Sequence, residues 1–377
     1  MKLDYKLGEE IRCWGVNIPN DLHLKLKDTF DSGWINTGPK ELEFRNLLKQ
    51  RFGGKYATAC MSGTAALNLA LEAAGVGKGD EVVSTPYTWL ATNTAIMERG
   101  AQPIFADIKY DDWNIDPQDV ERKITKKTKA IIGVHYAGNP FELNKMRSLA
   151  SNYNIPLIED CAHSMGSYYH GSPIGSGAEF ACFSFQCVKI VTCGDGGAVL
   201  TSSEKNYEKL QKLCWYGIDK SQKRLEFIDP VPSHPADLGF KYNMNDITAT
   251  MAVAAMEDLS DALERRAKLA NLYNEKLSNI DVIRPAKRDL DNTPNYQIYP
   301  VHVKDRECLA KIMLKDNIHL TVNNRRNDLY PVFGGLQELP NTSKCDSDTI
   351  LLPLHLGLSN NDIGRIFDRI DEYVKSA

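Results

Sequence analysis

The stretch CFSFQCVKIVTCGDGG, residues 182–197, carries the strongest indication of both fold and chemistry in this chain of 377 residues. It begins as an apolar, aromatic strand pattern, places Lys189 between Val188 and Ile190, and ends in a glycine cluster before another apolar run. The apolar neighbours indicate a buried side chain, although a lysine is seldom buried without a partner. An exposed lysine in a turn is the other interpretation. Burial lowers the pKa of an ammonium group, and a neutral amine can form a Schiff base with a carbonyl. Lys189 is therefore a candidate covalent catalyst.

Short apolar runs alternate with helical patterns around this stretch, between about residue 55 and residue 200. Several runs are apolar throughout, as in a sheet whose two faces are both covered by helices. The expected strands are 56–60, 81–84, 102–106, 130–134, 157–159, 180–185 and 198–201. Helical patterns lie between them at 65–74, 92–99 and 144–153. This alternation predicts an α/β fold with a mostly parallel sheet of seven strands flanked by helices.

The rest of the chain predicts a long connection followed by a smaller unit. Residues 216–244 are polar and proline-bearing, and we interpret them as a functional excursion or a reach toward a partner subunit. A helical pattern from about residue 246 to residue 279 has a break near Ser260. The later expected elements are strand 297–303, helix 306–316, strand 351–352 and helix 361–374. We predict a large domain over residues 1–258 and a smaller α+β domain over residues 259–377.

Composition excludes several classes of protein. The chain has 45 Lys+Arg and 49 Asp+Glu, a formal charge of −4, and 42% hydrophobic residues. That balance is typical of a soluble globular protein and argues against a disordered chain. It offers no basic excess to neutralise phosphates, so we expect no nucleic-acid partner.

The cysteines and the apolar runs indicate a location. Nine cysteines are scattered through the chain, and none forms a Cys-x-x-Cys pair, so neither a disulfide framework nor a zinc ribbon is suggested. There is no apolar signal-peptide core at the start and no run of about 18 apolar residues. We expect a cytoplasmic protein that does not enter a membrane.

Two further motifs follow expected strands. Ser62-Gly63-Thr64 lies between a strand and a helix, where free backbone amides and the helix dipole attract anions. A plain N-cap is the other interpretation. Asp160 ends an apolar strand, where α/β folds bind ligands. It is a candidate metal ligand, helix cap or counter-ion to a protonated ring nitrogen, but the sequence has no matching His/Asp cluster, so we predict no metal.

An anion site, a carboxylate for a ring nitrogen and a lysine together describe a site for pyridoxal 5'-phosphate. Other cofactor motifs fail on spacing. No Gly-x-Gly-x-x-Gly follows a strand, and no Gly-x-x-x-x-Gly-Lys-Ser/Thr is present. The glycines of residues 171–177 lead into a strand, so we interpret that segment as a turn.

The sequence resembles the DegT/StrS family of nucleotide-sugar aminotransferases, which belong to pyridoxal-phosphate fold type I, the aspartate aminotransferase superfamily. The resemblance covers nearly the whole chain. Its motifs are SGWINTG (32–38), SGTAALNLAL (62–71), GDEVVSTPYTWLAT (79–92), GAQPIFADI (100–108), TKAIIGVHYAGNP (128–140), IEDCAHSMGS (158–167), FSFQCVKIVTCGDGG (183–197) and GFKYNMNDITA (239–249).

The resemblance implies a role for each motif residue. Lys189 would bind the cofactor as a Schiff base and transfer the proton between cofactor and substrate carbons, and Asp160 would pair with the pyridinium nitrogen. The phosphate would be held by Gly63, Thr64 and Ser184. Trp89 would stack on the ring face, unless it is a core tryptophan. His163 would lie near the ring's phenolic oxygen, unless it is a satisfied core histidine.

One departure from the family pattern concerns the partner subunit. Many members read Gly-x-Asn-x-Arg where this chain has Gly239-Phe-Lys241-Tyr-Asn243. In those members the asparagine reaches the neighbouring subunit's phosphate. A branch resembling C4-sugar aminotransferases reads Lys-Tyr-Asn, so Asn243, or failing that Lys241, would take this role. The resemblance thus implies a homodimer with two-fold symmetry.

The activity implied is transfer of an amino group, from glutamate by analogy, to a keto-sugar nucleotide. Lysine at position 189 argues against the family's dehydratases, which have histidine there. VHYAG at residues 134–138 and the Lys-Tyr-Asn variant favour C4 of a 4-keto-6-deoxy sugar over C3. Arg325, Arg326 and Tyr330 either approach the diphosphate or sugar, or lie on the surface.

The sequence is also compatible with two other functions on the same fold. A cysteine desulfurase or lyase needs a thiol on a mobile loop, for which Cys345 in the polar stretch 341–348 is the candidate. A non-catalytic, cofactor-binding regulator would retain the colour of the cofactor without reacting with glutamate.

Overall fold

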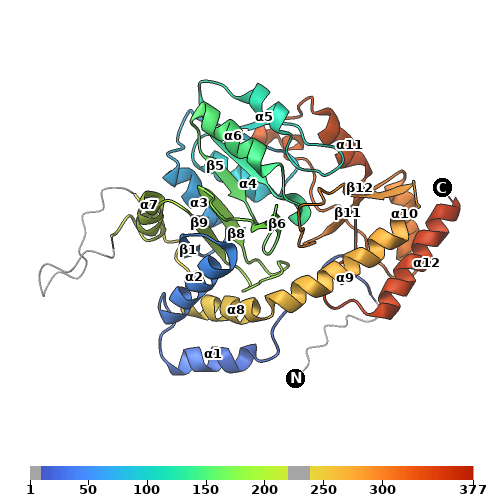
Figure 1. Ribbon diagram of the computed structural model, residues 1–377, viewed down its shortest axis with the longest axis horizontal. Coiled ribbons are helices and arrows are strands. Elements are labelled where there is room, and N and C mark those ends of the chain that lie inside the picture. The colour runs from blue at the N-terminus through green and yellow to red at the C-terminus, as the bar shows by residue number, and fades with distance from the viewer. Residues whose placement is uncertain (1–9, 220–237, 377) are drawn as a thin grey trace, which may run out of the picture.

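A sheet of seven strands forms the centre of the computed structural model, which describes residues 10–219 and 238–376 (Figure 1). The strands run in the order β1-β9-β8-β5-β4-β2-β3, and β9 is antiparallel to its neighbours while the other neighbouring pairs are parallel. Their bounds are β1 (Tyr56–Cys60), β2 (Glu81–Ser84), β3 (Gln102–Phe105), β4 (Thr128–Val134), β5 (Leu157–Asp160), β8 (Phe180–Ser184) and β9 (Gly197–Thr201). The predicted mostly parallel, seven-stranded sheet is confirmed.

Helices cover both faces of this sheet, which explains why most residues of its strands are buried and several strands are largely apolar. One face packs against α2 (Pro39–Phe52), α5 (Pro117–Lys123), α6 (Leu143–Tyr153) and α8 (Asp246–Glu257). The other packs against α3 (Gly63–Ala73), α4 (Leu90–Glu98) and α7 (Glu204–Cys214). Within β8, Ala181 and Phe183 face the first core, whereas Phe180 and Cys182 face the second.

A second, antiparallel sheet lies in the C-terminal part of the chain (Figure 1). It consists of β10 (Ile283–Pro285), β11 (Tyr299–Val303) and β12 (Thr349–Leu352), and its core includes residues of α9 (Leu259–Leu277), α10 (Arg306–Leu314) and α12 (Asn360–Ser376). The expected break in the long helical pattern falls at Asp258, between α8 and α9. Ile11 also packs in this core and pairs with Ile318, so the start of the described chain lies with the C-terminal sheet.

The remaining elements lie around these two sheets. They are α1 (Leu22–Asp31), α11 (Pro340–Asp348), the hairpin of β6 (Tyr168–Tyr169) and β7 (Ser172–Pro173), and short 3-10 turns at Tyr136–Gly138, Asn327–Leu329 and Pro331–Phe333. Of the predicted excursion, residues 220–237 lie outside the described residues, and Trp215 and Lys241 pair where the described chain leaves and returns. In the described part of the chain, no helix combines the length and apolar character needed to span a membrane.

Candidate active site

The carboxyl ends of β1, β5 and β8 bring the predicted residues to one edge of the sheet. Asp160 is the last residue of β5, Ser184 is the last of β8, and Ser62 follows β1 by two positions. These strands point the same way, so their carboxyl ends meet at the edge where α/β folds bind ligands. The turn that carries Lys189 connects β8 to β9 at this edge.

Lys189 lies in a turn that is held by hydrogen bonds to Gln186. Its N–H donates to the Gln186 carbonyl at 2.8 Å, and the Gln186 Oε1 accepts from the Val188 N–H at 3.1 Å. The side chain keeps some exposure, yet the surrounding protein desolvates its amine and lowers its pKa to about 8, while the carboxylate of Asp160 opposes the shift. A substantial fraction of the amine is therefore neutral near pH 8.

Asp160 is buried and held by two hydrogen-bond donors. Thr92 Oγ1 donates to Oδ2 at 2.8 Å, and the backbone N–H of Ala162 donates to Oδ1 at 3.1 Å. Burial raises the pKa of this carboxyl, whereas the two donors and the charge of Lys189 act in the opposite direction. A cation placed against Asp160 would lower that pKa and stabilise the ionised carboxylate.

Glu159, the residue before Asp160, belongs to a separate buried cluster. Its Oε1 accepts from Arg147 Nη2 at 2.8 Å, and its Oε2 lies 3.4 Å from His135 Nε2. Burial opposes ionisation, but the hydrogen bond to His135 and the charges of His135 and Arg147 outweigh it and lower the pKa of Glu159. This acid is thus engaged within the protein and faces away from the Asp160 side of the strand.

An anion cradle forms where the N-terminus of α3 meets the end of β8. Ser62 Oγ caps α3 by accepting from the Ala65 N–H at 3.1 Å. A Cβ at Gly63 would lie 2.7 Å from Ser184 Cβ, so only glycine allows this close approach. Gly63, Thr64 and Ser184 are therefore brought together beside the free amides of the first helical turn.

His163 lies between the lysine turn and Tyr136. Its ring meets the Tyr136 ring edge-on at 6.2 Å, and its Nδ1 is buried without a hydrogen-bond partner among the described residues. Burial, and then the charge of Lys189, lower the pKa of His163 well below its ordinary value. The imidazole is therefore neutral, with one ring nitrogen available to a ligand.

The predicted contacts of Trp89 and Asn243 involve a ligand and a second subunit, respectively. Trp89 is the N-cap residue of α4 and is 62% exposed, so it is not a core tryptophan, and its stacking on a ring stays a prediction. Asn243 pairs with Cys60 as an isolated bridge. Its Nδ2 donates to Thr37 Oγ1 at 2.6 Å, and its Oδ1 accepts from Lys241 Nζ at 2.5 Å. Its reach to a neighbouring subunit also stays a prediction.

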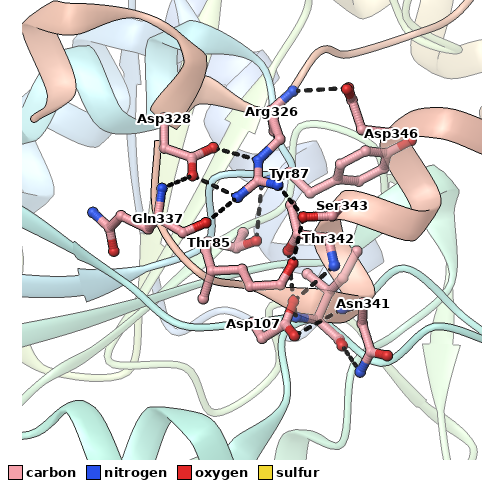
Figure 2. Close-up of polar contacts among 12 residues, drawn as sticks. Thr85, Tyr87, Asp107, Arg326, Asp328, Gln337, Asn341, Thr342, Ser343 and Asp346 are labelled. Atoms are coloured by element: carbon pink, nitrogen blue, oxygen red, sulfur yellow. Dashed lines mark hydrogen bonds and ion pairs between the residues drawn. The ribbon is translucent and has the colours of Figure 1, made fainter. Parts of the chain in front are cut away.

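Arg326 is not free to bind a diphosphate, because its guanidinium is buried in an ion pair (Figure 2). Nε and Nη2 donate to the two oxygens of Asp328 at 2.7 and 2.6 Å, and Nη2 also donates to the Gln337 carbonyl at 2.9 Å. Arg325 and Tyr330, on the same segment, are exposed. Of the two arginines, Arg325 is thus the one whose side chain faces solvent.

The expectation that Cys345 lies on a mobile loop is wrong. Cys345 is fully buried in α11, and its Sγ contacts the Tyr110 carbonyl at 3.7 Å. Burial raises the pKa of this thiol, which is the opposite of what a nucleophilic cysteine requires. The desulfurase alternative thereby loses its candidate nucleophile.

Sequence reasoning missed several residues that hold the site together. Thr92 lies 68 positions from the Asp160 it contacts, and the pairing of His135 with Glu159 spans 24 positions. A threonine early in a helix that follows a sheet strand was the available signal, but nothing local distinguishes it from other helical threonines. These contacts depend on which strands become neighbours in the sheet.

Together the residues fit pyridoxal 5'-phosphate. The Gly63 cradle suits the phosphate and the buried carboxylate of Asp160 suits a protonated ring nitrogen. The Nδ1 of His163, which has no hydrogen-bond partner in the described part of the chain, suits a ring oxygen. The Lys189 amine, with its lowered pKa, suits the aldehyde. Each group sits at the same sheet edge.

Comparison with known proteins gives one consistent result. Uncharacterized protein MJ1066 of Methanocaldococcus jannaschii is 33% identical to this chain over 361 residues, which cover 92% of this chain and 93% of that protein. The crystal structure of sugar aminotransferase CalS13 from Micromonospora echinospora has a TM-score of 0.90 at 28% identity, covering 96% of this chain and 99% of that one.

A further similar structure is Spr1654 from Streptococcus pneumoniae, solved in a PLP-form and a PMP-form. Both have a TM-score of 0.89 at 26% identity, cover 97% of this chain, and are themselves covered to 99% and 98%. Residues 17–371 match the family described as the DegT/DnrJ/EryC1/StrS aminotransferase family. The fold and the matched residues confirm the resemblance noted in the sequence, and the chain belongs to the DegT/DnrJ/EryC1/StrS aminotransferase family.

Proposed function

We propose that this aminotransferase uses pyridoxal 5'-phosphate to transfer the amino group of glutamate to C4 of a nucleoside-diphosphate 4-keto-6-deoxyhexose. The family and the PLP-form of Spr1654 support the cofactor, and the description of CalS13 as a sugar aminotransferase supports the class of substrate. The observation that carries the proposal is the lysine of lowered pKa, Lys189, at the same sheet edge as Asp160 and the Gly63 cradle. The C4 position is supported by the residues 134–138 and 241–243 that resemble C4-sugar aminotransferases.

The overall reaction balances without any further oxidant or reductant. The α-carbon of glutamate is oxidised from an amine to a ketone, which gives 2-oxoglutarate. The keto carbon of the sugar is reduced to an amine, and the nitrogen moves from the first substrate to the second. The two half-reactions therefore run in turn at one site.

When bound, the cofactor supplies an electron sink that stabilises negative charge at the carbon losing a proton. The protein supplies the rest. The neutral Nζ of Lys189 accepts the proton from that carbon and returns it to the other reacting carbon, a role that suits its pKa of about 8. The carboxylate of Asp160, which accepts from the Thr92 hydroxyl, would stabilise a positive charge on the ring nitrogen of the cofactor.

We further propose a homodimer whose active sites are shared. Phe30, Trp34 and Ile35 are each more than half exposed, an unusual cost for large apolar side chains on one short segment. This segment adjoins Thr37, which accepts from Asn243, so an interface formed here would lie beside Asn243 and Lys241, the residues proposed to reach the neighbour's phosphate. A second copy of this chain is the partner that a closed, two-fold interface requires.

We also propose that the protein works in the cytoplasm. None of the nine cysteines forms a disulfide in the described structure, as expected in a reducing compartment. Oxidation state in intact cells, read by thiol alkylation and mass spectrometry, tests this: paired cysteines would contradict it.

Absorption spectra test the proposed activity. Glutamate added to the yellow, cofactor-loaded protein should bleach the absorbance of the cofactor bound at Lys189, and a 4-keto sugar nucleotide added afterwards should restore it. A panel of 3-keto and 4-keto substrates carrying dTDP, UDP or GDP then identifies position and nucleotide. An unchanged spectrum at saturating glutamate contradicts the glutamate half-reaction. If the cofactor keeps its colour with every amino donor, the protein is instead a non-catalytic, cofactor-binding regulator.

A further inference from the structure

A glutamine from outside the large sheet contacts the turn of Lys189 on both sides. Gln297 precedes β11, and its Nε2 donates to the Val188 carbonyl at 2.8 Å while its Oε1 accepts from the Ile190 N–H at 3.3 Å. Each of these groups belongs to a peptide bond that flanks Lys189. One carboxamide therefore fixes both peptide planes through which the Lys189 side chain is attached.

Gln297 is itself held from two directions. Its backbone N–H donates to Asn295 Oδ1 at 2.9 Å, and its carbonyl accepts from Arg266 Nη1 at 3.1 Å. Arg266 lies in α9 and also donates to the Leu354 carbonyl after β12 at 3.2 Å. The glutamine is thus tied to the helix and the sheet of the C-terminal part of the chain.

The segment that carries Gln297 also lies against the loop of His163. Asn295 Nδ2 donates to the Met165 carbonyl at 2.8 Å, and a Cβ at Gly138 would lie 1.8 Å from Asn295 Oδ1. Asn295, Gln297 and Arg266 are all at least 95% buried. Hydrogen bonds between buried polar groups favour one geometry, because breaking such a bond leaves a buried partner unsatisfied.

We infer that Gln297 is a positioning residue, which sets the direction of the Lys189 side chain by holding both adjacent peptides and ties that direction to the C-terminal sheet. This inference rests on the proposed role of Lys189. Its physical basis is that a proton transfer between fixed carbons depends steeply on where the amine lies, so that a displacement of about 1 Å can cost roughly a hundredfold in rate.

The pKa of Lys189 offers a readout that does not depend on turnover. Asp160 from β5 and Cys187 from the same turn act to raise this pKa, and the charge of Lys189 in turn helps to keep His163 neutral. Burial is the dominant cause of the lowered value. If the turn loses Gln297, the amine gains access to water, and its pKa should rise from about 8 toward its ordinary 10.5.

The test compares Gln297→Met with Gln211→Met. Methionine keeps the volume of glutamine but makes neither hydrogen bond. Gln211 is the control because it lies in α7, and its side chain donates to Thr58 Oγ1 at 2.7 Å rather than to the turn of Lys189. Gln297→Asn is a second variant, since it keeps the amide but is one methylene too short to reach both peptides. Acetic anhydride labelling of the cofactor-free proteins across pH, quantified at Lys189 by mass spectrometry, gives the pKa.

We expect both Gln297 variants to raise the pKa of Lys189 and to slow the glutamate half-reaction at saturating glutamate by about tenfold to a hundredfold. Gln211→Met should match the wild type in both measurements. A lowered melting temperature with an unchanged lysine pKa and unchanged rate would reduce Gln297 to a structural residue and overturn the inference.

A measurement on the wild type covers the case in which the variants do not fold. The amide of Ile190 should exchange with solvent as slowly as the amides of β8, because it is hydrogen-bonded to Gln297. Fast exchange would overturn the inference. The proposed function fails separately, if glutamate leaves the wild-type spectrum unchanged.

Discussion

The surroundings of Lys189 determine the pKa of its amine. Burial lowers this pKa to about 8, although the carboxylate of Asp160 acts in the opposite direction. Only the neutral amine attacks an aldehyde. We therefore predict that the rate at which pyridoxal 5'-phosphate attaches to cofactor-free protein rises with pH and levels off above about pH 8. In Asp160→Asn the midpoint should move to lower pH, because the carboxylate that favours the ammonium form is gone. Stopped-flow absorbance measures both, and a wild-type midpoint near pH 10 contradicts the account.

The hydroxyl of Thr92 is the side-chain donor that steadies the ionised form of Asp160, at 2.8 Å. Thr92→Val removes it without changing the shape of the side chain much. Leaving a buried carboxylate short of a donor costs about 1–3 kcal/mol, so the cofactor should bind roughly 5- to 150-fold more weakly. Equilibrium titration with the cofactor measures the loss. Thr250→Val, a buried threonine in α8, is the control and should keep wild-type affinity.

At the scale of residues, the sequence indicates candidate site residues that follow a strand, but it does not indicate the residues that hydrogen-bond to them. The placement of Lys189, Asp160 and Gly63 at one sheet edge could be predicted because each lies at the end of a recognisable strand or shortly after it. Thr92 and Gln297 could not, because their partners lie 68 and more than 100 positions away. Which side chains meet across such distances is decided by the strand order, and a local pattern does not contain it.

At the scale of elements, the cradle depends on how closely α3 approaches β8. A Cβ at Gly63 would lie 2.7 Å from Ser184 Cβ, so Gly63→Ala should push the helix end away from the strand. We predict that this variant loses affinity for pyridoxal 5'-phosphate but keeps its affinity for pyridoxal, which has no phosphate. Gly77→Ala, where an added Cβ meets nothing within 4 Å, is the control. Equal losses for both compounds in Gly63→Ala would contradict a phosphate cradle at this position.

Elements with a regular apolar pattern were predicted closely, whereas α11 was not. Its polar sequence suggests a loop around Cys345. The segment is helical because Asp107, which follows β3, caps its N-terminus. The carboxylate of Asp107 accepts from the Thr342 N–H at 2.8 Å and from the Asn341 N–H at 3.0 Å (Figure 2). Asp107 lies more than 230 positions earlier in the chain. The N-cap residue of α11, Leu339, provides no side-chain cap, so Pro340 at the first helical position is the start signal that its own sequence contains.

At the scale of the whole molecule, the proposed dimer makes each active site depend on two chains. Lys189→Ala and Asn243→Ala should each be inactive alone. Mixed and reassembled in equal amounts, half of the dimers should contain one intact site, which gives about a quarter of wild-type activity if Asn243 acts across the interface. If Asn243 serves its own chain, the mixture stays inactive. Turnover of the keto-sugar nucleotide, with sedimentation velocity to verify dimers, decides between the two.

The central claim is that the cofactor aldehyde is bound by the amine at position 189 and by no other. Borohydride reduction of the yellow wild-type protein, followed by digestion and mass spectrometry, tests it directly because reduction makes the link permanent. We predict the added mass on the peptide containing Lys189, with no label after glutamate has bleached the colour. Label on a different lysine, or colour that persists and reacts without any modification of Lys189, would contradict the account.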